Sequence, residues 1–205
     1  MCSLAKILPL KNPQFADKTL IVIVSGLPRS GTSMMMQMLV AGGIAPIWDG
    51  VREADVDNPH GYYEFEQVKR TKQDPSWLIG SEGKVVKMVH VLLHDLPKDR
   101  PYRVIMMRRR IEAVLKSQTA MLSRLGEEGA DVPQDKLARV FESQMEEALL
   151  MLSKTPCFEV MQVWYGMVIE HTQSQAERIN QFLSGELNVD AMVAAVDPSL
   201  RRQRA

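Results

Sequence analysis

Short apolar runs alternate with longer amphipathic segments along most of this chain. Four runs rich in aliphatic residues are bounded by turn residues, and they cover residues 19–26, 84–93, 102–108 and 158–165. Such runs are typical of strands that are buried on both faces of a parallel sheet. Between them, apolar residues recur at helical spacing in residues 31–43, 111–125, 134–152 and 174–183. The alternation predicts an α/β domain with a mostly parallel central sheet flanked by helices.

Two of the helical segments show a clear apolar face, which we expect to pack against the sheet. In residues 111–125 this face is formed by Ile111, Val114, Leu115, Met121, Leu122 and Leu125. In residues 134–152 it is formed by Leu137, Val140, Phe141, Ala148, Leu149 and Leu152.

Residues 49–83 break the alternation. This segment is polar and rich in turn residues, and it is only weakly periodic apart from a possible short helix near residues 63–72. Connections of this length in a compact domain are usually functional loops, so we interpret it as a lid or an acceptor-binding insertion. The alternative is a mobile surface insertion. Residues 1–17 are interpreted as a tail, and residues 18–205 as a single domain.

Composition narrows the classes of partner. The 205 residues are 45% hydrophobic, enough to build a core, and 25 basic residues balance 25 acidic ones. A neutral chain has no global attraction for nucleic acid or for an anionic membrane, so any anion site must be local. The two cysteines are not spaced as metal ligands, and no apolar run reaches 18 residues. We therefore expect a cytoplasmic protein without a disulfide framework and without a membrane span.

The stretch "GLPRSGTS", residues 26–33, lies between a predicted strand and a predicted helix. In this context, glycines permit a tight turn, and the first amides of the helix converge on an anion. A nucleotide triphosphatase loop would carry a lysine where Thr32 stands, whereas here the positive charge is Arg29. No later strand ends in an aspartate suited to hold Mg²⁺. The pattern indicates a phosphate site without triphosphate chemistry; the alternative is an ordinary strand-to-helix turn.

The same stretch resembles the 5′-phosphosulfate loop of sulfotransferases that use 3′-phosphoadenosine-5′-phosphosulfate (PAPS). Its arginine form is similar to that of tyrosylprotein and many bacterial sulfotransferases, while soluble phenol and steroid types carry a lysine there. The resemblance implies a three-layer P-loop fold and metal-independent transfer of a sulfuryl group from PAPS to a hydroxyl or amine, leaving PAP. It implies that Arg29 stabilises the leaving phosphate. The loop residues it implies as donor ligands are Pro28, Arg29, Ser30, Gly31, Thr32 and Ser33.

A second element of the resemblance is "RRRIEAVLKS". The family's 3′-phosphate site is an arginine at a strand end followed by a serine in the next helix, which Arg109 and Ser117 match in spacing. Weaker similarities to the family extend over residues 19–195, with His90 one residue late relative to the "K-T-H" of cytosolic members. Two departures affect the expected adenosine contacts. Arg-Ile follows Arg109 in place of Asp-Pro, and no R-K-G…G-D-W segment is present.

The acceptor must lose a proton, so a general base is required. Asp49 stands at a family-like distance from Arg29 and is the first candidate, followed by Glu64 and then His90; Glu53 also competes. A purely structural role is the alternative for each of them. The nearby aromatic residues Tyr62, Tyr63 and Phe65 are candidates for an acceptor pocket. Two rival functions stay open: a small-molecule kinase with a degenerate loop, and a non-catalytic nucleotide-binding protein.

Overall fold

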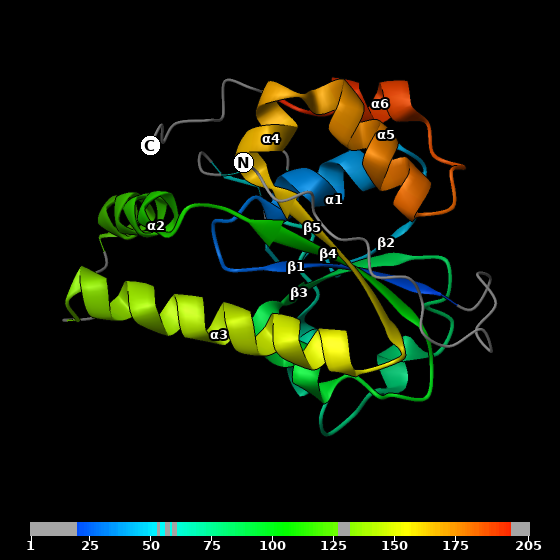
Figure 1. The fold of residues 1–205 in the computed structure, drawn as a ribbon, viewed down its shortest axis with the longest axis horizontal. Coiled ribbons are helices and arrows are strands. Elements are labelled where there is room, and N and C mark those ends of the chain that lie inside the picture. The colour runs from blue at the N-terminus through cyan, green and yellow to red at the C-terminus, as the bar shows by residue number, and fades with distance from the viewer. Residues whose placement is uncertain (1–19, 53, 56–57, 59–60, 127–131, 198–205) are drawn as a thin grey trace.

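The computed structural model describes residues 20–52, 54–55, 58, 61–126 and 132–197 (Figure 1). The predicted tail 1–17 and the candidate base Glu53 lie outside this part of the chain. Of the helices that are described, none is both long and apolar enough to cross a lipid bilayer.

The sheet has five parallel strands in the order β2-β3-β1-β4-β5. Their bounds are β1 Ile21–Gly26, β2 Pro46–Ile47, β3 Val85–Val89, β4 Tyr102–Arg108 and β5 Phe158–Trp164. The predicted α/β class and the four predicted strands are confirmed. The two-residue β2 is too short to give a pattern. The strand predicted over residues 84–93 ends earlier than expected, because residues after Val89 turn into the 3₁₀ helix η4 (His90–Asp95).

Helices cover both faces of this sheet. In Figure 1, α1, α4, α5 and α6 lie on one face and α3 lies on the other, while α2 lies beyond the end of β4. Their bounds are α1 Thr32–Ala41, α2 Ile111–Leu125, α3 Gln134–Lys154, α4 Tyr165–Glu170, α5 Thr172–Phe182 and α6 Val189–Ala194. The four predicted helices are present. The prediction missed α4 and α6, since one and a half turns are too short to show helical periodicity.

The helical faces pack largely as expected. Val114, Ala148 and Leu152 are buried. Val140, however, is 41% exposed, so its predicted place in the core is wrong. The reason is visible in Figure 1: the first part of α3 runs past the sheet, and only its second half lies beneath the strands.

The strand order places a switch point at the centre of the sheet. The chain continues from β1 through α1 to β2 and β3 on one side, whereas β4 pairs with the other side of β1. In open parallel sheets, the loops at the carboxyl ends of such strands diverge and leave a crevice, where ligands bind. The loop that follows β1 lies at this point.

Candidate active site

The loop between β1 and α1 depends on its two glycines. Gly26 has φ 151°, and a Cβ there would lie 2.6 Å from Ser30 Oγ and 2.7 Å from the Met107 carbonyl oxygen. Gly31 has φ 99°, and a Cβ there would lie 2.5 Å from the ring of Tyr165. Both positions combine a left-handed backbone with a close approach, so only glycine fits.

The loop ends on the amino terminus of α1. No side chain caps this helix, and its first backbone bond runs from the Met35 amide to the Gly31 carbonyl oxygen at 3.1 Å. The amides of Thr32, Ser33 and Met34 therefore have no backbone acceptor within the helix. All three residues line a cavity of about 370 Å³. Free amides and the helix dipole together make this end of the cavity suited to bind an anion.

Ser30 does not contribute a side chain to that surface. It is fully buried behind the loop, and its amide donates to the Leu27 carbonyl oxygen at 3.1 Å. Pro28 and Gly31 do line the cavity. Of the six loop residues implied by the resemblance, Ser30 is thus the one that the structure turns away from the cavity.

The tertiary structure joins the loop to the second predicted phosphate element. Arg29 Nε donates to Ser117 Oγ at 3.1 Å, and Arg109 Nη1 donates to the Arg29 carbonyl oxygen at 2.9 Å. The Arg109 guanidinium also lies 4.6 Å from the centre of the Tyr165 ring, the ring that packs on Gly31. Two segments about 80 residues apart in the chain therefore form one cationic surface.

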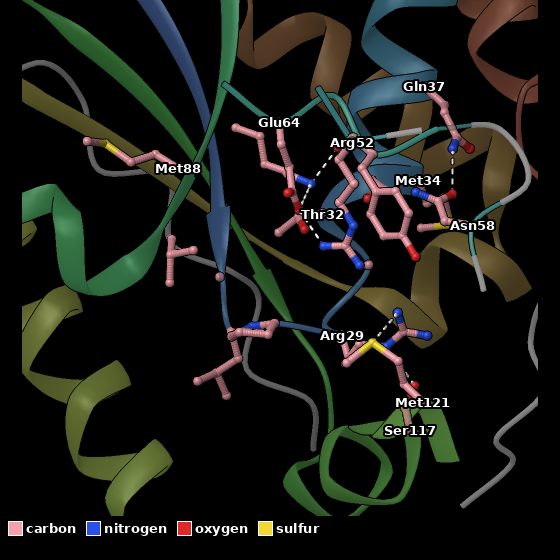
Figure 2. Close-up of a pocket in the computed structure, with 18 of the residues that line it drawn as sticks. Arg29, Thr32, Met34, Gln37, Arg52, Asn58, Glu64, Met88, Ser117 and Met121 are labelled. Carbon is pink, nitrogen blue, oxygen red and sulfur yellow. Dashed lines mark hydrogen bonds and ion pairs between the residues drawn. The ribbon is translucent and has the colours of Figure 1, made fainter. Parts of the chain in front are cut away.

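Charged side chains from several elements line the same cavity (Figure 2). The basic ones are Arg29, Arg52, Lys69, Lys87, Arg109 and Arg124. The acidic ones are Glu64, Glu66 and Asp197. Basic groups are in excess, so the local field favours an anionic ligand although the whole chain is neutral.

Asp49, the first candidate for the base, is not brought to the cavity. Its carboxylate accepts from the amides of Val51 at 3.0 Å and Glu66 at 2.6 Å, and the side chain is exposed. These two bonds, first that from Glu66, lower the pKa of Asp49 below its ordinary value. Through these two bonds, Asp49 links the chain at Val51 to the first residue of the 3₁₀ helix η2 (Glu66–Arg70). Its geometry is that of a structural residue.

The predicted lid is anchored over the first helix. Asn58, near its tip, accepts from Gln37 of α1 at 3.2 Å and donates to the carbonyl oxygen of Gly61. The Tyr62 hydroxyl donates to the Asp55 carboxylate at 2.8 Å. The short helix predicted near residues 63–72 is present as η2. These contacts hold the residues that follow Tyr62 against the mouth of the anion site.

Glu64 lies at this mouth and lines the cavity. Its Oε1 accepts from Arg52 Nη1 at 3.0 Å and from Lys87 Nζ at 3.2 Å. Its Oε2 makes no hydrogen bond to any other described residue. Lys87 also donates to the Tyr62 carbonyl oxygen, and its burial lowers its pKa. Glu64 is thus held by one oxygen while the other is available to a ligand.

His90, the third candidate, faces the interior. Its side chain is 2% exposed; Nδ1 lies 3.3 Å from the Gly26 carbonyl oxygen and Nε2 lies 3.3 Å from Gln144 Oε1. Burial lowers its pKa below the usual value. His90 does not line the cavity, and it supports the loop from behind. Among the aromatic candidates, Tyr62 and Phe65 line the cavity, whereas Tyr63 packs on Trp48 at a centroid distance of 5.7 Å.

Arg52, Lys87 and Tyr165 are among the residues of the site that the sequence interpretation missed. Lys87 had a signal, because a lone cation inside the apolar run "VVKMV" needs a buried partner. Arg52 had none, because its place in the site depends on contacts with Tyr62, 3.6 Å from the ring centre, and with Glu64 at 3.0 Å, which the sequence does not show. Among the described residues, no three His, Cys, Asp or Glu side chains gather in a group that could hold a metal ion.

Comparisons with known proteins agree on the fold. The chain is similar to the sulfotransferase domain of the Synechococcus PCC 7002 olefin synthase, with a TM-score of 0.57 and 15% identity over 93% of this chain and 82% of that one. It is also similar to a sulfotransferase domain from the curacin biosynthetic pathway, with a TM-score of 0.52 and 15% identity over 87% and 84%. No protein-family model and no curated protein sequence matches it. The chain therefore has a sulfotransferase fold, as the resemblance implied.

Proposed function

We propose that this protein is a sulfotransferase that moves a sulfuryl group from PAPS to a hydroxyl or amine acceptor without a metal ion. The observation that carries the proposal is the meeting of Arg29 with Arg109 and Ser117 beside the free amides of α1. The sulfotransferase fold of the two similar domains supports it. We place the reaction in the cytoplasm because of the cysteine usage.

The residues present fit a donor with two phosphate groups. The amides and hydroxyls of Thr32 and Ser33 would hold the 5′-phosphosulfate, with Pro28 and Gly31 shaping the loop. Arg109 and Ser117 would hold the 3′-phosphate through charge-assisted bonds of about 1.5–3 kcal/mol each. Tyr165, which supports both Gly31 and Arg109, would keep the two subsites in register.

The proposed chemistry uses two further residues. Glu64 takes the proton of the acceptor hydroxyl as its oxygen bonds to sulfur, and the bond from sulfur to the phosphate oxygen breaks. The products are a sulfate ester and PAP. Arg29 stabilises the negative charge that grows on the departing phosphate oxygen. Its guanidinium rests on Ser117 in the structure, so it must turn toward the reacting group when a 3′-phosphate takes the serine hydroxyl.

Binding of PAP should stabilise the protein and should not need a metal. At a ligand concentration of 100 times Kd, we expect about 2.7 kcal/mol of added stability, measured as a thermal shift that EDTA leaves unchanged. AMP and ATP with Mg²⁺ serve as comparisons, and both should give smaller shifts. A thermal shift that requires Mg²⁺ would contradict the sulfotransferase proposal and favour the rival function of a small-molecule kinase. PAP binding without transfer to any acceptor would indicate the non-catalytic protein.

Arg109→Ala should weaken PAP much more than adenosine 5′-phosphosulfate, which lacks the 3′-phosphate. The difference in binding free energy should be on the order of 2 kcal/mol, measured by calorimetry, because a charge-assisted contact is lost with PAP alone. Arg110→Ala is the matched control: the neighbouring arginine is exposed and lies 3.6 Å from Glu112. Equal losses for both ligands in Arg109→Ala would mean that Arg109 only braces the loop through the Arg29 carbonyl group.

A further inference from the structure

The cavity has an apolar end that the donor does not explain. Six apolar residues line it: Leu27, Phe65, Val68, Met88, Val89 and Leu92. All but Val89 belong to, or pack against, one hydrophobic cluster beneath the sheet. Val89 is 40% exposed, so this end opens to the surface there.

This apolar end lies away from the phosphate subsites. In Figure 2, Met88 is at the left, Ser117 and Met121 are at the lower right, and Glu64 is at the upper centre. A group that reaches Glu64 from the apolar end therefore meets a sulfuryl group delivered from the opposite end. The apolar lining of the cavity is also held in place at Phe65, because the Phe65 ring packs edge-on against Trp77 with ring centroids 5.9 Å apart.

The charged groups at this end are already paired. Glu64 accepts from Arg52 and Lys87, and Glu66 accepts from Lys69 at 2.6 Å. At this end of the cavity, the three cations Arg52, Lys69 and Lys87 outnumber the two carboxylates of Glu64 and Glu66. A primary amine is protonated near pH 7 and would be repelled by this excess of positive charge. A sugar would place several hydroxyls against an apolar wall, where they would lose their hydrogen bonds to water.

We propose that the acceptor is an uncharged alcohol with an aliphatic body, whose hydroxyl lies at Glu64 and whose chain lies along Leu27, Phe65, Met88 and Leu92 toward Val89. This inference rests on the proposed sulfotransferase function, and it selects one acceptor class from those that the function allows.

The test uses the full chain saturated with PAP and a series of straight-chain primary alcohols from propanol to octanol. Calorimetry should show that Kd falls about fourfold for each added methylene, until the chain reaches the opening at Val89. With PAPS in place of PAP, kcat/KM should rise in parallel. The alkylamine of each length should bind more weakly than its alcohol at pH 7. Glucose should show no saturable binding.

Two variants test where the alkyl chain of the acceptor lies. Leu92→Ser and Val89→Ser should flatten the dependence of Kd on chain length and leave the PAP thermal shift intact, which also shows that they fold. Ile79→Ser, at a position 80% exposed and outside the cavity lining, should change neither.

The outcomes separate the two proposals. Alcohol affinity independent of chain length, or a preference for amines or glucose, overturns the acceptor class and leaves the sulfotransferase function standing. Length-dependent binding without any transfer supports the apolar site and contradicts the proposed function. Failure to bind PAP overturns both.

Discussion

Replacing Glu64 by glutamine should lower kcat by ~10²–10⁴ while PAP still binds with nearly normal affinity. The carboxylate lies at the mouth of the anion site, and its Oε2 is available to accept the acceptor proton because Oε1 alone contacts Arg52 and Lys87. Glutamine keeps the shape and the hydrogen-bond acceptor but cannot take a proton at neutral pH. The measurement is kcat for transfer from PAPS to an alcohol, compared with the Kd of PAP for the same variant.

Two control variants test whether a loss of kcat in Glu64→Gln comes from a change in structure rather than from loss of the base. Glu147→Gln changes an exposed carboxylate of α3 and should keep normal kcat. Asp49→Asn should loosen the lid and raise KM for the acceptor, because it weakens the bonds to the Val51 and Glu66 amides, but it should keep most of kcat. A Glu64→Gln enzyme with normal kcat beside an inactive Asp49→Asn or His90→Gln would assign the base to one of those residues.

Arg29→Ala should lower kcat by about 10²–10³ and weaken PAP much less. A positive charge aimed at the leaving phosphate gains most in the transition state, where the negative charge on that oxygen is largest. The comparison of kcat with the Kd of PAP separates this role from simple donor binding. If the substitution weakened PAP binding by the same factor as it lowered kcat, Arg29 would be a donor-binding residue.

Arg29→Lys is the matched control for charge. It should recover part of kcat, because the ammonium keeps the charge but lacks the Nε that bonds to Ser117 Oγ at 3.1 Å. Near-normal kcat in the alanine variant would refute the assignment of Arg29 to the transition state.

Local patterns in the chain were sufficient to predict the fold class, and they indicated a candidate anion loop. The buried strands appear as apolar runs, and β1, the glycine turn and α1 are contiguous, so residues 26–33 could be recognised without knowing their neighbours. Arg109 and Ser117 were proposed from the resemblance, and a motif of this kind can be matched in a sequence because a strand end and the helix after it keep a constant spacing. In each of these segments, local backbone geometry determines where the side chains point.

The choice among the candidate bases depended on contacts between distant segments. From the sequence, Asp49 was ranked first as the candidate base, Glu64 second and His90 third. In the structure, Asp49 is bonded to backbone amides, His90 is buried under the Gly26 carbonyl group, and Glu64 alone reaches the cavity. Its position follows from Lys87 on β3 and from the lid anchor between Asn58 and Gln37. A long polar loop has little local conformational preference, so its path and the direction of its side chains are set by the tertiary contacts that it makes.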